Sequence, residues 1–246
     1  MKQTEFTVLK NEPLTENVYR MELSGDTSEI TGPGQFVNIL LEGFYLRRPI
    51  SVCDAKPGLL TIVYKKVGNG TTKMSTLANG AVLNVLTGLG NGYDLEQAGP
   101  KPLLLGGGVG VPPMYLLAKE LMARPETEEV TVILGFNKAS EVFYEAEFKA
   151  LGCRVIVTTA DGSYGTKGFV TDALPAEYSY FYTCGPEPML RAVYKATKTS
   201  GQFSFEERMG CGFGACMGCS CKTITGYKRI CKDGPVLRKE EILWEN

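Results

Sequence analysis

Histidine is absent from this sequence of 246 residues. That absence excludes several kinds of site, because Cys/His zinc fingers, Rieske centres and Ser-His or Cys-His catalytic pairs all need an imidazole ring. Proton chemistry near neutral pH would have to come from a cofactor, a partner or a side chain with a strongly shifted pKa. Whatever chemistry the chain supports must therefore be built from other groups.

An excess of charge of either sign is also missing. The net charge of −1 offers no electrostatic attraction for nucleic acid or a membrane surface. The first residues, MKQTEFTVLK, contain no apolar core of a signal peptide, and glycines and prolines interrupt the longest apolar stretch, PLLLGGGVGVPPMYLLA. We expect a cytoplasmic protein, and structural disulfides are not expected in that reducing compartment.

The chain divides into three regions of different pattern. Residues 1–98 hold short runs rich in Val, Ile, Leu and aromatic residues between Gly/Pro/Asn/Asp turns, which predicts an antiparallel β-barrel or sandwich. Residues 99–200 alternate strands with helices, as parallel α/β sheets do. Residues 201–246 form a small cysteine-rich region. The predicted fold is therefore multi-domain α+β, with two domains followed by a small module.

One glycine-rich stretch lies between a predicted strand and a predicted helix. In LLLGGGVGVPPMYLLAKEL, residues 103–121, we expect the helix to begin near Pro112–Pro113, beside Gly107, Gly108 and Gly110. Backbone at such a turn can approach a phosphate closely. The stretch departs from G-x-G-x-x-G, and the next strand ends in Asn137–Lys138 rather than in an acid. A variant nucleotide site is favoured, and a purely structural turn stays open.

Two stretches in the first region also suit phosphate. VGNGTTKMSTL, residues 67–77, is a glycine loop that leads into a short helix with hydroxyls near its start, although an ordinary helix cap explains it as well. RRPISV, residues 47–52, puts two arginines directly before a strand. Adjacent arginines there fit a phosphate clamp, although exposed arginines are usually solvated.

The cysteines of the third region have a distinctive spacing. Cys211-x4-Cys216-x2-Cys219, followed later by Cys231, matches the plant-type 2Fe–2S ferredoxin pattern. A four-cysteine zinc site and free structural cysteines stay open as alternatives, but zinc ribbons favour two Cys-x2-Cys knuckles and only one is present. The spacing does not need Cys221. Cys53 and Cys153 resemble small core residues, whereas Cys184 opens the motif CGPEPML.

These motifs together resemble the ferredoxin–NADP reductase superfamily, in which a flavin-binding barrel precedes a pyridine-nucleotide domain. RPIS resembles its flavin motif, with Ile50 in place of an aromatic residue; GNGTTKMS resembles its flavin pyrophosphate loop; GGGVGVPP and CGPEPML resemble its nicotinamide-nucleotide motifs. The resemblance implies three sets of residues. They are, for FAD, Arg48, Pro49, Ile50, Ser51, Lys65, Lys66, Val67, Gly70, Thr71 and Thr72; for NAD, Gly107, Gly108, Gly110, Cys184 and Gly185; and for a 2Fe–2S cluster, Cys211, Cys216, Cys219 and Cys231.

Within the superfamily, the whole chain resembles the electron-transfer subunits of dihydroorotate dehydrogenase B, most of all through EERMGCGFGACMGCSCK and YKRICKDGPV. The resemblance implies an oxidoreductase of pyrimidine biosynthesis. An FMN-bearing catalytic partner oxidises dihydroorotate, and electrons pass through the cluster and FAD to NAD+, in a heterotetramer with two copies of each chain. Two alternatives stay open: the flavin–cluster subunit of an NADH-dependent ferredoxin:NADP+ oxidoreductase or sulfide dehydrogenase, and a non-redox, zinc-bearing assembly subunit.

Overall fold

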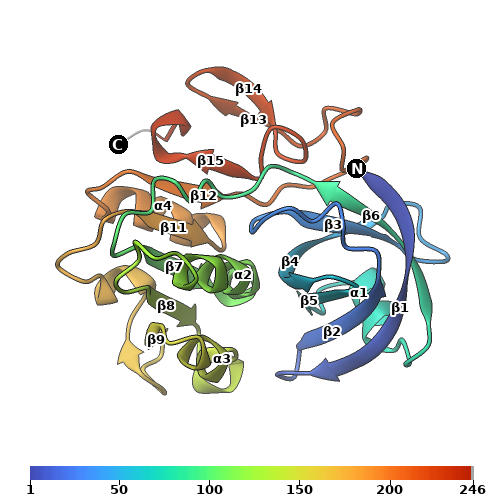
Figure 1. Ribbon diagram of the computed structural model, residues 1–246, viewed down its shortest axis with the longest axis horizontal. Coiled ribbons are helices and arrows are strands. Elements are labelled where there is room, and N and C mark those ends of the chain that lie inside the picture. The colour runs from blue at the N-terminus through green and yellow to red at the C-terminus, as the bar shows by residue number, and fades with distance from the viewer. Residues whose placement is uncertain (245–246) are drawn as a thin grey trace.

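The computed structural model describes residues 1–244 and begins with a closed antiparallel barrel (Figure 1). Alternate residues of its strands point inward and form one apolar core, which the short helix α1 (Asn69–Ser75) covers with Met74. The strands follow the order β1-β2-β5-β4-β3-β6 around the barrel. They are β1 (Lys2–Pro13), β2 (Val18–Gly25), β3 (Phe36–Leu40), β4 (Arg48–Lys56), β5 (Leu59–Lys65) and β6 (Val82–Leu89).

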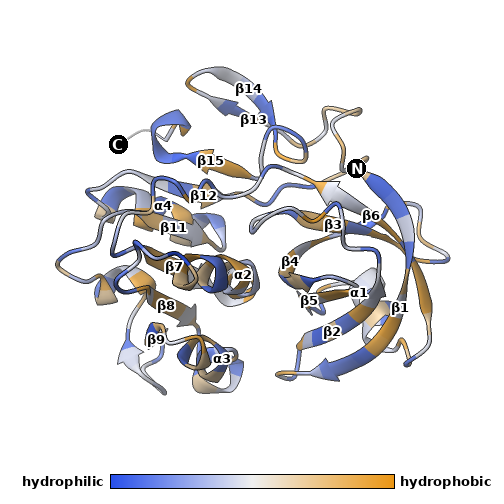
Figure 2. Cartoon of the chain, viewed as in Figure 1, coloured by the Kyte–Doolittle hydropathy of each residue, from blue (hydrophilic) through white to orange (hydrophobic). Residues whose placement is uncertain are grey.

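The second part of the chain forms a sheet of seven strands in the order β10-β9-β8-β7-β11-β12-β15, parallel except for β15. Figure 2 shows β7 and β8 as largely hydrophobic, as strands covered on both faces must be. The strands are β7 (Leu103–Gly107), β8 (Thr131–Phe136), β9 (Arg154–Thr159), β10 (Thr166–Lys167), β11 (Phe181–Cys184), β12 (Gly201–Ser204) and β15 (Val236–Arg238). The predicted fold class of barrel, parallel α/β sheet and cysteine-rich region is confirmed.

Helices cover both faces of this sheet. Helices α2 (Val111–Met122) and α3 (Glu145–Ala150) share a core with Leu104, whereas α4 (Glu187–Ala196) packs with Leu103 and Leu105 on the opposite face. Helix α2 has its two prolines in the first turn, where a missing N–H costs nothing, so the predicted helix start is confirmed. No helix within residues 1–244 has the length and apolar character that crossing a bilayer requires.

The barrel and the sheet meet in a shared apolar cluster, which is separate from the inner core of the barrel. Val18, Cys53 and Val63 of the barrel lie in the same apolar cluster as the buried face of α2. At its edge the Lys119 ammonium donates to both carboxylate oxygens of Asp54, at 2.8 and 3.1 Å. The two halves are therefore held by buried apolar packing and by a partly exposed ion pair.

The cysteine segment, defined here as residues 205–235, leaves the sheet after β12 and returns to it at β15 (Figure 1). It contains a hairpin of β13 (Ser220–Thr223) and β14 (Gly226–Arg229). Its buried side chains, Cys219, Ile230 and Cys231, pack with Phe36, Leu86 and Leu89 of the barrel. The segment therefore contacts both halves of the molecule.

An aromatic cluster holds the end of the chain on the outer face of the sheet. Phe203 of β12 lies edge-on to Phe181 at 5.4 Å between ring centroids and to Trp244 at 5.7 Å. The Arg191 guanidinium stacks over the Trp244 ring at 5.0 Å. Because Phe203 lies on the strand that leads into the cysteine segment, this cluster also fixes where that segment begins.

We expect Phe203→Ala to destabilise the protein by about 3–5 kcal/mol, because it leaves a large cavity among packed rings. The midpoint of thermal unfolding, followed by circular dichroism, should fall by roughly 10 °C. Tyr227→Ala is the control, since that side chain is 72% exposed at the hairpin and its loss should change the midpoint little. Equal midpoints for the two variants would contradict the role given to the cluster.

Candidate functional site

A cleft of about 1420 Å³ lies between the barrel and the carboxyl ends of the parallel strands. It brings together most of the residues that the sequence proposes for FAD and NAD, although they come from four separate stretches of the chain. Those on its lining are Arg48, Pro49, Ile50, Ser51, Lys65, Val67, Thr71, Gly107, Gly108, Gly110, Cys184 and Gly185. Lys66, Gly70 and Thr72 lie beside these residues in the chain but do not line the cleft.

The two adjacent arginines have different surroundings. Arg47 donates to the carbonyl oxygens of Asn38 (3.2 Å) and Asn84 (3.1 Å) and to the side-chain oxygen of Asn84 (2.6 Å), so it ties β3 to β6. Arg48 donates to the carbonyl of Leu46 and stacks over the Phe44 ring, 4.8 Å from its centroid. Among the described residues neither arginine has a carboxylate partner. Arg48 therefore keeps a charge at the cleft that an anion can neutralise.

Gly70 allows Arg48 to reach α1. A Cβ atom at position 70 would collide with the guanidinium of Arg48, so only glycine permits this approach. The Thr71 hydroxyl accepts hydrogen bonds from the backbone N–H groups of Val67 (2.9 Å) and Gly68 (3.3 Å). The Thr71 hydroxyl thus stabilises the start of the helix, as the helix-cap interpretation expects. The loop that it holds brings Val67 to the cleft.

The glycine turn after β7 lies against the turn after β11. A Cβ atom at Gly110 would collide with the carbonyl of Cys184, and one at Gly107 would collide with the sulfur of Met189. Strand β7 lies between β8 and β11. After β7 the chain proceeds outward through β8, β9 and β10 on one side and then crosses back to β11 on the other side. Open α/β sheets bind ligands at such a switch point, outside the carboxyl ends of the strands. The sheet topology thus adds a reason for a nucleotide site that the imperfect glycine motif could not supply.

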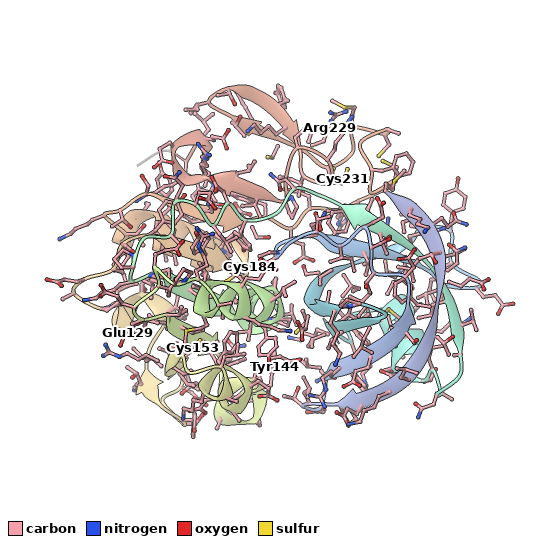
Figure 3. All side chains as sticks on the ribbon, viewed as in Figure 1. Glu129, Tyr144, Cys153, Cys184, Arg229 and Cys231 are labelled. Atoms are coloured by element: carbon pink, nitrogen blue, oxygen red, sulfur yellow. The ribbon has the colours of Figure 1, made fainter. Side chains whose placement is uncertain are left out.

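Cys184 lies between the sheet and the barrel, below the cysteine segment in Figure 3. Burial raises the pKa of its thiol to about 12, an effect that a hydrogen bond with Ser204 only partly offsets. The residue therefore presents a neutral thiol rather than a thiolate to the cleft.

The four proposed cluster ligands lie together in the cysteine segment as two pairs, Cys211 with Cys216 and Cys219 with Cys231. The Cys211 sulfur accepts hydrogen bonds from the backbone N–H groups of Ala215 (3.2 Å) and Cys216 (3.4 Å). The Cys219 sulfur accepts one from the N–H of Cys231 at 3.4 Å. Within residues 1–244, no three cysteine or acidic side chains already stand in the arrangement that a single metal ion would need.

The local chemistry fits metal-bound sulfur. Burial raises the pKa of Cys211, but hydrogen bonds from the N–H groups of Phe213, Cys216 and Ala215 outweigh it and lower that pKa to about 6. Gly212 and Gly214 supply the positive φ angles, +79° and +91°, that wrap the backbone around this sulfur. A loop that stabilises a thiolate with backbone N–H groups is suited to the anionic sulfurs of an iron–sulfur centre.

Arg229 holds this loop against the returning chain. Its guanidinium donates to the Gly214 carbonyl at 3.0 Å and to both carboxylate oxygens of Asp233 at 2.9 and 3.1 Å. Hydrogen bonds from Arg229, first from its guanidinium and then from its backbone N–H, lower the pKa of Asp233 to about 2, well below its usual range. Cys221 lies on β13, where it packs against the apolar cluster that contains Cys219 and Cys231 and also lines a smaller cavity, and burial raises the pKa of its thiol.

Some residues of the cleft were not anticipated from the sequence. The segment Glu206–Met209, directly before Cys211, lines it, as do Asn137, Glu141 and Phe169 from the carboxyl ends of β8 and β10. Only Asn137 had a signal in the sequence, since it directly follows the predicted strand VTVILGF. Glu206–Met209 and Phe169 follow short strands that the sequence pattern did not reveal. Which strand ends meet depends on the order of strands in the sheet, and the sequence does not show that order.

A cleft flanked by a barrel arginine and a nucleotide-type glycine turn, beside a cysteine loop, defines an iron–sulfur oxidoreductase with the ferredoxin–NADP reductase architecture. Two family models agree with this class. Residues 104–195 match the oxidoreductase NAD-binding domain, and residues 206–243 match the iron–sulfur cluster binding domain of dihydroorotate dehydrogenase B. The predictions of an oxidoreductase, of NAD binding and of an iron–sulfur cluster are thereby confirmed.

Curated relatives narrow the class to one family. The chain is 43% identical to the dihydroorotate dehydrogenase B (NAD(+)) electron transfer subunit of Geobacillus sp. (strain WCH70), with 99% of each chain covered. It is 44% identical to the subunit of that name from Fusobacterium nucleatum, covering 98% of this chain and 99% of the relative. The chain belongs to the family of dihydroorotate dehydrogenase B electron transfer subunits, as the resemblance predicted.

Solved structures show the same architecture. An NADH-dependent reduced ferredoxin–NADP oxidoreductase that performs flavin-based electron bifurcation matches with a TM-score of 0.87 and 31% identity, over 97% of this chain and 90% of that one. A ferredoxin–NADP+ reductase from Neisseria gonorrhoeae, solved with bound FAD and NADP, matches with a TM-score of 0.69 and 19% identity, over 80% and 90%. At that identity the second likeness shows the fold alone.

We expect Arg48→Ala to weaken FAD binding about tenfold to a hundredfold, because it removes a charge-assisted contact worth roughly 1.5–3 kcal/mol. The flavin content of the protein after gel filtration measures this loss. Arg154→Ala, a change of the same charge at an exposed site away from the cleft, is the control and should retain flavin. Full retention by the Arg48 variant would move the proposed clamp to Arg47.

We expect Cys219→Ser to abolish the electron paramagnetic resonance signal of the reduced cluster and Cys221→Ser to preserve it. Cys219 is buried within the cysteine segment and is paired with Cys231. Cys221 instead lines the smaller cavity beside Trp244. The two variants are matched, since each removes one sulfur from the same short stretch. The reverse pattern of signals would show that Cys221 is the ligand.

Proposed function

We propose that this chain carries electrons from a dihydroorotate-oxidising partner to NAD+. The partner bears FMN, the 2Fe–2S cluster receives electrons singly, and FAD, which exchanges either single electrons or a hydride, connects the cluster to the nicotinamide. Membership of the electron-transfer subunit family supports this role. A heterotetramer with two copies of each chain, in the cytoplasm and in pyrimidine biosynthesis, completes the proposal.

The position of the cysteine segment beside the cleft supports the proposed electron transfer independently of the resemblance. The segment Glu206–Met209 lines the cleft, and only Gly210 separates it from Cys211, so the proposed ligands follow directly on from the cleft wall. Further along the cysteine segment, Cys219 and Cys231 pack on barrel strands β3 and β6. A cluster in the loop would thus be attached to the structure that holds the flavin.

Different residues of the cleft would bind the two nucleotides, FAD on the barrel side and NAD+ on the sheet side. On the barrel side, Arg48 supplies an uncompensated positive charge for the FAD phosphates, beside Pro49, Ile50 and Ser51 of β4. On the sheet side, Gly108 and Gly110 keep side chains away from the turn, so that a second nucleotide can approach the backbone. The two nucleotides would then meet in one cleft with their reactive rings enclosed between the halves.

A second function in the same class is favoured by the structural match to the bifurcating NADH-dependent reduced ferredoxin–NADP oxidoreductase, which covers 97% of this chain. In that case the partner would be a different flavoprotein and dihydroorotate would play no part. The identity of 31% to that structure is lower than the 43–44% shared with the dihydroorotate dehydrogenase B subunits, so the dihydroorotate relay is the primary proposal.

We expect the isolated protein to oxidise NADH with an artificial electron acceptor and to leave dihydroorotate unchanged. Mixed with the FMN-bearing subunit, it should support dihydroorotate-dependent reduction of NAD+, followed as absorbance of NADH. In the mixture Cys219→Ser should lose this activity while retaining FAD and the partner, and Cys221→Ser should keep it.

Two outcomes would contradict the relay. Turnover of dihydroorotate by the isolated chain would require a substrate site in this chain. A normal rate of NAD+ reduction by a cluster-free Cys219→Ser complex would make the cluster dispensable. Reduction of NADP+ by ferredoxin in place of the dihydroorotate reaction would favour the second function.

A further inference from the structure

The carboxyl end of β8 holds an acidic side chain in a place that the sequence pattern does not reveal. Strand β8 runs beside β7, with Gly135 opposite Gly107. After it, the short 3-10 helix η2 (Ala139–Glu141) turns the chain back on itself. The Glu141 carboxylate consequently accepts hydrogen bonds from the backbone N–H of Asn137 (3.3 Å) and from its side-chain amide (3.0 Å). Glu141 lines the cleft.

This position has a defined meaning in dinucleotide-binding sheets. The strand beside the glycine-turn strand commonly ends in an acid that accepts a hydrogen bond from the ribose 2′-hydroxyl of NAD, whereas NADP-binding sites accommodate the 2′-phosphate with arginine. Here the strand ends in Asn137–Lys138, but the chain reversal returns a carboxylate to the N–H of the first residue after the strand. The acid at this position is Glu141, which comes four residues after Asn137 in the sequence.

The Glu141 carboxylate is fixed in orientation and has spare capacity. Both of its observed hydrogen bonds go to one oxygen, Oε2, and a carboxylate has about four lone-pair positions. It has no ion pair with a lysine or arginine within the described chain. A ligand hydroxyl can therefore donate to it, while a phosphate would meet an unneutralised negative charge.

Two neighbours bear on the choice of ligand. Phe169 lines the same end of the cleft and is 66% exposed, which leaves a ring free to stack with a nucleobase. Lys138 also lines the cleft and would favour a phosphate, but Asp161 lies near it on the turn after β9. Hydrogen bonds with Ser163, assisted by the charge of Lys138, lower the pKa of Asp161, so that carboxylate stays ionised and offsets the lysine.

We propose that Glu141 selects NAD over NADP, by accepting a hydrogen bond from the 2′-hydroxyl of the adenosine ribose and by repelling a 2′-phosphate in its place. The inference rests on the proposed function only in taking the cleft to be a pyridine-dinucleotide site. It adds the residue that sets the nucleotide preference.

The test compares two probes that differ only by the 2′-phosphate. Isothermal titration calorimetry on the full chain measures the dissociation constants of ADP-ribose and 2′-phospho-ADP-ribose, without any electron transfer. Glu141→Gln keeps an acceptor oxygen for Asn137 and removes the charge. We expect the variant to bind ADP-ribose about tenfold more weakly and to bind 2′-phospho-ADP-ribose more tightly, which changes the ratio of the two constants by about ten- to a hundredfold.

Glu129→Gln is the matched control, because it removes the same charge near the other end of β8 from a residue that does not line the cleft. Its ratio should stay within about threefold of the wild type, since exposed charges are screened over short distances. The NADH-to-NADPH ratio of kcat/KM with an artificial acceptor should move in parallel with the calorimetric ratio.

The outcomes separate this inference from the relay. Unchanged ratios in Glu141→Gln, or an equal change in Glu129→Gln, would overturn the role of Glu141 while leaving the dihydroorotate relay intact. Failure of both probes to bind the wild-type chain would overturn the inference together with the NAD site of the proposed function. A wild-type chain that prefers 2′-phospho-ADP-ribose would overturn the inference as well.

Discussion

The pairing of β12 with β15 is the constraint on which the arrangement of the site depends. These neighbouring strands carry the two ends of the cysteine segment, and β12 in turn pairs with β11, the strand that ends at Cys184. The cysteine loop is thereby tied to the strand that presents the nucleotide-side turn. Apolar packing on Phe36, Leu86 and Leu89 of the barrel then fixes its other side. The barrel, the parallel sheet and the cysteine segment, which have different sequence patterns, therefore meet at the β12–β15 edge of the sheet.

A second constraint sets the width of the cleft. Helix α2 begins at the glycine turn and packs its buried face against barrel residues such as Val18 and Val63. The helix that presents the nucleotide turn is thus also the helix that joins the two halves. Lys119, near the other end of α2, forms its ion pair with Asp54 of β4, the strand that begins at Arg48. This contact surface connects the barrel side and the sheet side of the cleft, in addition to the cysteine segment, which also contacts both halves.

Much of this architecture could be predicted from local patterns. All six barrel strands, the helix start at Pro112–Pro113 and the strand-helix alternation follow from periodicity and turn residues, which act over a few positions. Contacts between distant segments could not be predicted in this way. The pattern gave no sign that β12 and β15 extend the nucleotide sheet, because both are only three or four residues long. Glu141 was likewise hidden, since its place depends on a reversal of the chain after the strand. The proposed ligands of each cofactor and the limits of the three regions stay predictions.

The cysteine segment starts and ends on adjacent strands, and this has a consequence for how the protein matures. Residues 204 and 236 are paired within the sheet, so the sheet itself can close without order in the segment between them. The cost of holding a loop whose ends are already together grows only slowly with its length. Metal insertion would then order a local loop on a finished scaffold, rather than drive the folding of the whole chain. Delivery of iron and sulfur would then be separable from biosynthesis of the polypeptide, and a folded, cluster-free form would be an intermediate of assembly.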